Sequence, residues 1–355
     1  MTTPVRERAL GWLTRLPLGP SVTGAVLVLA PLLMATDFAL SVWLRFCIFL
    51  ILLTGLNLIN GLAGMISLAQ AGFFGLGAYA AGVASTNWGV PTLVAFFLAP
   101  VVVTVVALVV GAASMRLRAI YFTMATLGIG YILYLLFGRA TDLTGGPNGL
   151  VGVPPLSVLG FTFTAPIALY LLGAVCALLG AIVAHNITVS RTGRALRALG
   201  ASEPAAVASG ANAFKLRMFA FALSGFYAGV AGAIEVFDAR FVSPSTFDFF
   251  TAVLLLVALV IGGPGTALGP LFGAALLTAL EVFAADFADY EPLITGLAFL
   301  LAIQLFPKGV AGEWASRQTQ RRFAARRTAH ADLDGRGEED VLHVSQDQGN
   351  RPVGE

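Results

Sequence analysis

Long stretches without a single ionisable side chain are the feature that most restricts how this chain can fold. No Asp, Glu, Lys, Arg or His occurs between Arg45 and Arg116. The same residue types are absent from four further stretches, which are 119–138, 218–234, 249–280 and 292–307. A membrane-spanning helix needs about 20 mostly apolar residues, and a charge at the bilayer centre costs at least ~2.5–3.5 kcal/mol. The chain is therefore predicted to be an integral membrane protein.

The composition supports this conclusion and excludes other classes of protein. Hydrophobic residues make up 57% of the 355 residues and charged residues 11%. A typical soluble domain has about 45–50% apolar and about 25% charged residues. The net charge of +2 is too small to indicate a nucleic-acid partner. Cys47 and Cys176 lie in separate apolar runs and are predicted to be packing residues, because they form no disulfide framework and no Cys/His zinc spacing.

The apolar runs predict an all-α integral membrane protein with about ten transmembrane helices. Some of the predicted helices are shorter than ~20 residues, so tilted, broken or re-entrant pieces are expected. The predicted spans are 21–36, 40–60, 66–85, 91–113, 119–138, 166–185, 216–235, 249–263, 269–285 and 292–306.

The distribution of Lys and Arg predicts the orientation, because short cytoplasmic loops carry an excess of both residues. Three arginines precede the first predicted span. Basic residues also occupy the loop at 116–118, the loop at 186–215 and the region after residue 307. The loops between them are acidic or of mixed charge. Both termini are therefore predicted to be cytoplasmic, and removing one span would place a basic loop outside.

These patterns divide the chain into three regions. Residues 1–20 are predicted to be a cytoplasmic segment before a retained first helix, because no small-residue cleavage site of a signal peptide follows. Residues 21–311 would form the transmembrane domain, with a cytoplasmic loop at about 186–217. Residues 312–355 are polar and charged and predict a disordered cytoplasmic tail. The basic start of this tail would either contact anionic membrane lipid or serve only to keep the tail soluble.

Two glycine-rich stretches interrupt the apolar pattern. The first, GLAGMISLAQAGFFGLGAYAAG at 61–82, predicts either close helix packing or a broken helix that lines a solute path. The second, GGPGTALGPLFGAALL at 262–277, contains two prolines and predicts a tight turn between two spans. Four polar residues of the second and third spans would either form interhelical hydrogen bonds or line the translocation path, and they are Asn57, Asn60, Ser67 and Gln70.

No pattern of an enzyme is present in the sequence. The Ser, His and Asp residues form no triad pattern, and His185, His330 and His343 are too scattered for a metal site. The chain has two lysines, Lys215 and Lys308, and neither lies in a GK[ST] element, so a Walker A loop is excluded. The chain is therefore not expected to be an enzyme, to hold a metal or to bind a cofactor itself, and any ATP would be bound by another subunit.

Few ionisable residues lie within the predicted spans. Proton-coupled carriers usually place such residues there. Glu235 and Glu281 are the candidates, and both lie near span ends, where an interfacial position is favoured over a proton relay.

The segment SRTGRALRALGASEPAAVASGANAFKLR at 190–217 has the form of a docking element. Basic residues lie toward its two ends, and the part between them predicts a short helix. Four residues suit the N-cap, the first-turn dipole, an early helical position and the helix end, and they are Ser202, Glu203, Pro204 and Gly210. A simple amphipathic surface turn is the alternative interpretation.

Four stretches, in this order, resemble the permease subunits of ABC importers for branched-chain amino acids, the LivM type. They are LNLINGLAGMISLAQAGFFGLGAYAA, TDLTGGPNGLVGVP, SRTGRALRALGASEPAAVASGANAFKLRMFAFALSGFYAGVAGAI and FVSPSTFDF with GGPGTALGPLFGAALL. Together they cover most of the chain from about 40 to 310. Two departures are the weakly polar RALGASEPAAVASG, and Pro147 where relatives often have Ser or Thr.

The resemblance implies a set of partners. Two permease subunits, this chain with a LivH-like chain or with a second copy of itself, would form the translocation path. Two cytoplasmic ABC ATPase subunits would dock on the inner side, and an extracytoplasmic solute-binding protein would deliver the solute. By this likeness the loop at 190–217 is the ATPase-coupling loop, with the residues Arg194, Arg197, Ser202, Glu203, Pro204, Ala205, Ala206 and Gly210. The implied location is the plasma (inner) membrane of a prokaryote.

The leading functional hypothesis is therefore an importer subunit for amino acids, branched-chain ones first, that works by alternating access. The family also includes permeases for urea, short amides and other carboxylate-bearing solutes. A self-sufficient secondary carrier or channel for a small polar solute is the main alternative, and a membrane-embedded enzyme is the third.

Overall fold

The computed structural model describes residues 18–33, 36–117, 119–158, 161–163, 165–285 and 296. Within these residues the chain is almost wholly helical, and five helical segments are long and apolar enough to cross a membrane. They are Asp37–Leu62, Thr92–Ser114, Ile120–Arg139, Pro166–Val189 and Ala213–Ala239. The prediction of an all-α membrane protein is thus confirmed.

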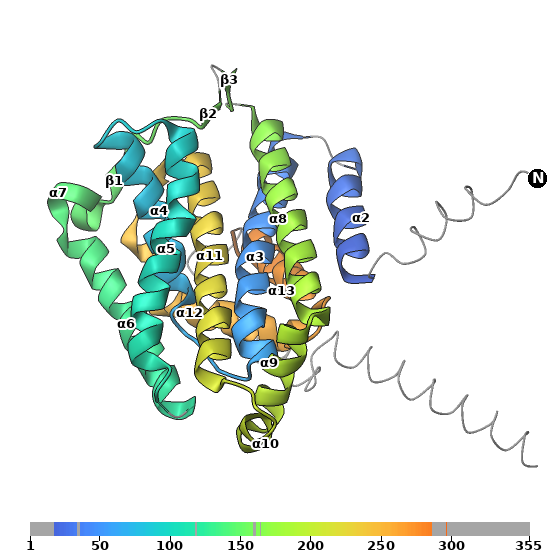
Figure 1. Cartoon of the computed structure of the whole chain (residues 1–355). Coiled ribbons are helices and arrows are strands. Elements are labelled where there is room, and N and C mark those ends of the chain that lie inside the picture. Colours follow the sequence, from blue (N-terminus) through green and yellow to red (C-terminus); the bar gives the residue numbers. More distant parts are fainter. Residues whose placement is uncertain are drawn as a thin grey trace, which may run out of the picture.

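An apolar helix lies at each of the first nine predicted spans (Figure 1). These helices are α2 (Leu18–Leu33), α3 (Asp37–Asn57), α4 (Gln70–Thr86), α5 (Thr92–Ser114), α6 (Ala119–Arg139), α8 (Pro166–Val189), α11 (Ala213–Ala239), α12 (Phe249–Gly262) and α13 (Gly269–Ala285). Apart from residue 296, the tenth predicted span lies outside the described residues, as do the predicted tail and residues 1–17.

Helix α11 lies at the centre of the bundle and packs against α3, α4 and α5 (Figure 1). Glycines bring these backbones together. A Cβ at Gly77 would lie 2.7 Å from the Cα atom of Gly229, and a Cβ at Gly229 would lie 2.5 Å from the Cα atom of Pro100. Because lipid gives helices no hydrophobic reason to associate, such close contacts supply much of the packing energy. Close packing is therefore one role of the glycine-rich stretch at 61–82.

The same stretch also contains a broken helix. Helix α3 continues into a π-helical turn, Leu58–Leu62, and the chain at 63–69 is not helical. Helix α4 consequently begins at Gln70, four residues later than predicted. Non-helical backbone at membrane depth needs partners inside the protein. The side-chain oxygen of Asn60 is one of them, since it accepts a hydrogen bond from the N–H of Ser67 at 3.0 Å.

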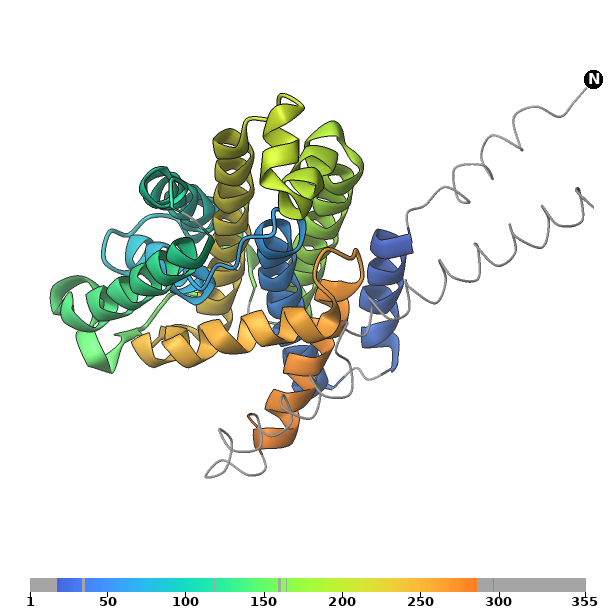
Figure 2. The ribbon, with the colours of Figure 1, turned by 90° about the horizontal axis from the view of Figure 1, so that it is seen from below.

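Helices α12 and α13 pack against one another and against α3. Figure 2 shows α12 crossing the bundle at a steep angle to α11. The turn between α12 and α13 contains Gly263 and Gly265, with φ angles of 107° and 76°. Side chains rarely allow these backbone angles, so glycine is required there. The predicted tight turn is confirmed.

Short strands lie at the end of the bundle opposite to α10 (Figure 1). Strand β1 (Leu150–Val151) pairs antiparallel with β4 (Phe241–Val242), and β2 (Ser157–Val158) pairs with β3 (Phe161–Thr162). The prediction did not include these two-residue strands, which only connect helices. The shorter helical elements in the same connections are α7 (Thr141–Thr144), η2 (Gly146–Asn148) and η3 (Pro244–Phe247).

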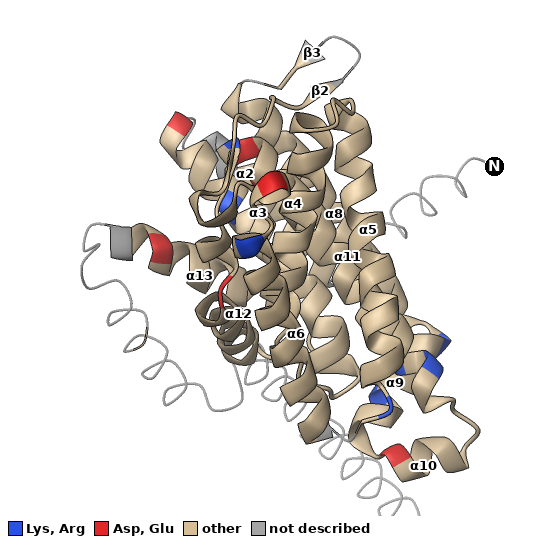
Figure 3. Ribbon diagram, turned by 90° about the vertical axis from the view of Figure 1, so that its left-hand side faces the viewer, with Lys and Arg blue, Asp and Glu red and all other residues tan. Residues whose placement is uncertain are grey.

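Charged residues gather in two groups along the bundle (Figure 3). One group lies on α9, α10 and the start of α11. The other includes residues in the first turns of α3, at the end of α6, in α7 and in the last turns of α11 and α13. Between them, α5, α6 and α8 carry many exposed aliphatic and aromatic side chains. This distribution fits a protein whose middle is surrounded by lipid or by other membrane subunits.

Candidate translocation path and coupling loop

The predicted coupling loop folds into two short helices at one end of the bundle. Helix α9 (Arg191–Ala201) follows α8, and α10 (Glu203–Ala208) follows α9 (Figure 1). Sequence reasoning predicted only the second of these helices. The missed signal is Ser190, whose Oγ accepts a hydrogen bond from the N–H of Gly193 at 3.2 Å. Serine is a favoured N-cap residue, so the start of α9 was readable from the sequence.

Helix α10 matches its prediction with one difference. Pro204 lies in the first turn, and the helix ends before Gly210, which has a φ of 89°. Ser202 occupies the predicted N-cap position, but its side chain makes no capping hydrogen bond. The carbonyl of Ser202 instead accepts a hydrogen bond from the N–H of Ala206 at 3.0 Å. The short helix is therefore held by backbone geometry and by Pro204 rather than by a side-chain cap.

An ion pair ties α10 to the central helix. The Nη2 atom of Arg217, in the first turns of α11, donates to Oε2 of Glu203 at 2.7 Å. The Glu203 side chain is 50% exposed, so solvent weakens the contribution of this pair to the free energy of unfolding. The consequence of this pair is geometric, because it links the orientation of α10 to that of α11.

One face of α10 is open to the surroundings. Pro204, Ala205 and Val207 are exposed, and half of the Val207 surface is accessible. Ala206, in contrast, is 3% exposed and faces the interior of the loop. A protein that docks on α10 would therefore contact Val207, which sequence reasoning did not single out, rather than Ala206.

Arg194 and Arg197 bind the end of α8. The Nη1 atom of Arg194 donates to the carbonyl oxygen of Val189 at 3.0 Å, and Nη2 of Arg197 donates to that of Thr188 at 2.9 Å. The last carbonyls of a helix lack partners within the helix, and cations are favoured there. Both arginines thus cap α8, and their role in coupling to an ATPase stays a prediction.

The predicted coupling loop touches the broken helix directly. A Cβ at Gly200, near the end of α9, would lie 2.8 Å from the carbonyl oxygen of Leu62. A Cβ at Gly64 would lie 3.0 Å from the Cα atom of Gly200. Because these backbones are in contact, a displacement of α9 would be passed to the chain between α3 and α4.

Asn57, a predicted path residue, joins this break to the turn between α12 and α13. Its Oδ1 accepts from the N–H of Gly265 at 2.7 Å, and its Nδ2 donates to the carbonyl oxygen of Thr266 at 3.0 Å. The two hydrogen bonds engage both the nitrogen and the oxygen of the amide group. The loop, the helix break and the α12–α13 turn therefore form one connected series of contacts.

We expect Asn57→Leu to lower the free energy of unfolding by about 1–3 kcal/mol, because a partly buried N–H and carbonyl would lose their partners. The matched control is Asn87→Leu, since Asn87 is exposed and its amide donates to the carbonyl of Leu143 at 3.1 Å. The control should change the value by less than about 0.5 kcal/mol. Unfolding of the purified protein by SDS in mixed micelles measures both. Equal effects of the two changes would contradict the role given to Asn57.

The other predicted path residues also lie within hydrogen-bonded packing. The side chain of Gln70 is buried, donates to the carbonyl of Leu52 at 3.1 Å and accepts from Oγ of Ser224 at 2.8 Å. Ser67 is buried beside Asn60, and Nδ2 of Asn60 is a buried donor with no partner among the described residues. These contacts join α3, α4 and α11. Contact with a solute stays a prediction for all four residues.

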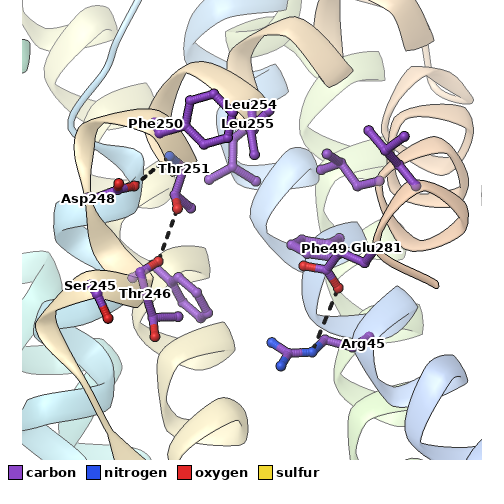
Figure 4. Close-up of a pocket in the computed structure, with 13 residues that line it drawn as sticks. Arg45, Phe49, Ser245, Thr246, Asp248, Phe250, Thr251, Leu254, Leu255 and Glu281 are labelled. Carbon is purple, nitrogen blue, oxygen red and sulfur yellow. Dashed lines mark hydrogen bonds and ion pairs between the residues drawn. The ribbon is translucent and has the colours of Figure 1, made fainter. Parts of the chain in front are cut away.

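A pocket that sequence reasoning missed opens at the other charged group. Its volume is about 270 Å³, and it lies between α3, η3, α12 and α13. Arg45 lines it, and Nη1 of Arg45 donates to both carboxylate oxygens of Glu235 at 2.9 and 3.0 Å. Glu235 is buried in the last turns of α11, and its position at the membrane interface stays a prediction. Glu281 lies on the same pocket, with Oε2 3.8 Å from Nε of Arg45 (Figure 4).

Sequence comparisons show which known proteins this chain is similar to. The family model described as the permease component of the branched-chain amino acid transport system matches residues 38–305. The chain is 29% identical over 286 residues to the LivM permease of high-affinity branched-chain amino acid transport from Salmonella typhimurium, covering 74% of this chain and 67% of LivM.

Permeases for other solutes are also similar to this chain. The ribose import permease RbsC of Escherichia coli is 30% identical over 179 residues, covering 47% of this chain and 50% of RbsC. The autoinducer 2 permease LsrC of an Enterobacter species is 30% identical over 243 residues, covering 64% of this chain and 66% of LsrC. No solved structure matches the chain. The family model covers most of the chain, and the chain therefore belongs to the family of branched-chain amino acid transport system permease components.

Proposed function

We propose that this chain is a transmembrane permease subunit of an ATP-driven ABC importer that moves amino acids, branched-chain ones first, into the cytoplasm. Family membership and the similarity to LivM support the transport class and the first choice of solute. The ribose and autoinducer 2 permeases among the relatives mean that the family carries chemically different solutes. Urea, short amides and other small carboxylates remain the alternatives within this proposal.

The proposed topology has ten spans with both termini in the cytoplasm of a prokaryotic cell. The α9–α10 end then faces the cytoplasm, and the pocket beside Arg45 lies toward the outer side. The basic residues at the α9–α10 end support this orientation, since Lys and Arg favour the cytoplasmic side.

The proposed mechanism is alternating access driven by partner subunits. ATP would be bound and hydrolysed by two cytoplasmic ATPases, and this chain would bind no cofactor. A LivH-like permease or a second copy of this chain would complete the path, and an extracytoplasmic binding protein would deliver the solute. One observation carries this proposal: α10 exposes its face at the basic end, while neighbouring α9 contacts the broken helix through Gly200 and Gly64.

A self-sufficient secondary carrier is the second candidate, and the buried pair of Arg45 and Glu235 favours it. Ionisable groups within membrane segments often serve ion coupling. The two charges here neutralise one another through a two-point contact, as in a structural ion pair. The importer therefore remains the better-supported function.

The pull-down of an ATPase subunit by the tagged full-length chain in mild detergent tests the proposal. Val207→Asp places a charge on the exposed face of α10 without touching the buried Ala206. The matched control is Val151→Asp, because Val151 is 69% exposed and lies on β1 at the opposite end of the bundle. We expect the wild type and the control to recover the ATPase, and Val207→Asp to recover at least about tenfold less, as for a charge buried in an interface.

The other outcomes would change either the docking site of the ATPase or the transport class. Equal recovery with both variants would keep the importer and place the ATPase contact elsewhere. Recovery of no ATPase even with the wild type, together with solute uptake driven by an ion gradient, would replace the importer by the secondary carrier.

A further inference from the structure

The pocket beside Arg45 combines charges of both signs with an apolar wall. Figure 4 shows Asp248 and Thr251 on one side of it, and Arg45, Glu281 and Phe49 on the other. Its volume of about 270 Å³ suits a small solute rather than a large ligand. The charged residues that line this pocket belong neither to the predicted coupling loop nor to the helix break between α3 and α4.

The guanidinium of Arg45 is held in place and keeps a donor for a ligand. Nη1 is used by Glu235, and Nε lies 3.8 Å from Oε2 of Glu281. Among the described residues no hydrogen bond leaves Nη2. Glu235 does not line the pocket. It binds the guanidinium from outside the pocket and so fixes its orientation. A preorganised donor of this kind loses little entropy when it binds a carboxylate.

Negatively charged hydrogen-bond acceptors lie in the same pocket. Glu281 lines it beside Arg45, and Asp248 lines the opposite side. One oxygen of Asp248, Oδ1, accepts from the N–H of Thr251 at 2.8 Å and caps α12, which leaves Oδ2 as its second acceptor. An ammonium group could therefore be bound while a carboxylate contacts Arg45. A ligand with only one charge would leave one of these groups without its partner.

The wall between the charged groups is apolar. Leu254 and Leu255 of α12 face the pocket from one side, and Leu277 and Leu280 of α13 and Phe49 of α3 complete it. Branched aliphatic side chains pack well against such a surface, and each buried CH₂ contributes about 0.8 kcal/mol. A sugar offers neither the two charges nor the apolar chain that this pocket would match.

We propose that this pocket is a binding site for a zwitterionic aliphatic α-amino acid. Nη2 of Arg45 binds the ligand carboxylate, Oδ2 of Asp248 on the opposite side binds the ammonium group, and the ligand side chain packs against Leu254 and Leu255. This inference rests on the proposed function and assigns a site for its solute on this chain.

Photo-crosslinking in membranes that contain the full-length chain with its partner subunits tests the site. The probe is L-photo-leucine, a leucine analogue with a diazirine in its side chain. We expect the crosslinked peptides to come from α12 and α13, around Leu254 and Leu277. Excess L-leucine should remove the crosslinks. The two half-molecules 4-methylpentanoate and 3-methylbutylamine should compete at least about tenfold less well, because each lacks one charge-assisted contact. D-ribose should not compete.

Two variants distinguish a loss of ligand binding from a loss of folding. Leu254→Trp fills the pocket and keeps every charge, and it should reduce crosslinking at least about tenfold. Its matched control, Leu179→Trp on the exposed face of α8, should crosslink as the wild type does. The double variant Arg45→Gln with Glu235→Gln removes the guanidinium without leaving a buried charge alone. It should bind L-leucine at least about tenfold more weakly while the protein stays folded.

The possible results test the binding site and the importer function independently. Crosslinks outside this pocket, or equal crosslinking of Leu254→Trp and its control, would overturn the site. Competition by 3-methylbutylamine as strong as by L-leucine would overturn the zwitterion assignment. ATP-dependent leucine uptake in the same membranes would then still support the importer. Crosslinks in the pocket combined with uptake that needs an ion gradient and no ATP would instead overturn the importer and keep the site.

Discussion

Arg45→Met is expected to lower the free energy of unfolding by about 3 kcal/mol, because it leaves the carboxylate of Glu235 buried without its partner. Glu235 is 8% exposed, and both of its oxygens accept from Nη1 of Arg45. Breaking a buried pair typically costs about 3–5 kcal/mol. The lower end applies here because the Arg45 side chain is 43% exposed. Unfolding by SDS in mixed micelles measures the change.

A double-mutant cycle isolates the pair. Adding Glu235→Gln to Arg45→Met removes the unpaired charge and should restore at least about 1.5 kcal/mol, since residues in contact are not additive. The control is Arg139→Met, because Arg139 is an exposed arginine at the end of α6 and its loss should cost less than about 0.5 kcal/mol. Additive effects of the two changes at the pair would show that Arg45 and Glu235 do not stabilise one another.

Gly232→Ala is expected to be comparably severe, with a loss of about 3 kcal/mol. A Cβ at Gly232 would collide with the carbonyl oxygen of Phe74 and would lie 2.5 Å from the backbone nitrogen of Ala78. Both atoms belong to the backbone of α4, so the two helices would have to separate. Overpacking costs about 1–3 kcal/mol, and the upper end is expected where no side chain can move aside.

The matched control for this prediction is Gly128→Ala on α6. A Cβ at Gly128 would meet no atom within 4 Å. The substitution should therefore be neutral or stabilising, by up to about 1 kcal/mol, because alanine is the better helix former. The monodisperse fraction after detergent extraction and the midpoint of thermal unfolding report both variants. A Gly232→Ala protein as stable as the Gly128→Ala protein would contradict the close packing of α11 on α4.

Local features of the chain were predictable. The membrane class, the approximate positions of nine helices and the turn at 262–269 follow from apolar runs and from glycine and proline, which act over a few residues. The same holds for α10, because Pro204 and Gly210 favour a helix start and a helix end by their own backbone preferences. The predictions of helix starts were incomplete where several residues could serve as the N-cap. Ser202 took the N-cap position without its hydrogen bond, and Ser190, an equally good N-cap, was overlooked.

Contacts between distant parts of the chain were not predictable in the same way. The sequence offered two roles for Gln70 and Asn57, and the structure shows the hydrogen bonds that each makes with elements far along the chain. Ala206 and Val207 are neighbours in the same short helix, yet one is buried and the other exposed. That difference depends on how α10 lies against α9 and α11, which hydrophobicity alone does not specify.

The sequence by itself therefore determined that this protein is a helical membrane protein with a structured loop, because burial in lipid and helix limits depend on residues close together in the chain. Only the tertiary structure decided which polar groups meet. Arg45 and Glu235 are separated by 190 positions. In the sequence they are single charges near the ends of two apolar runs, and only the packing of α3 on α11 makes them a buried ion pair beside a pocket.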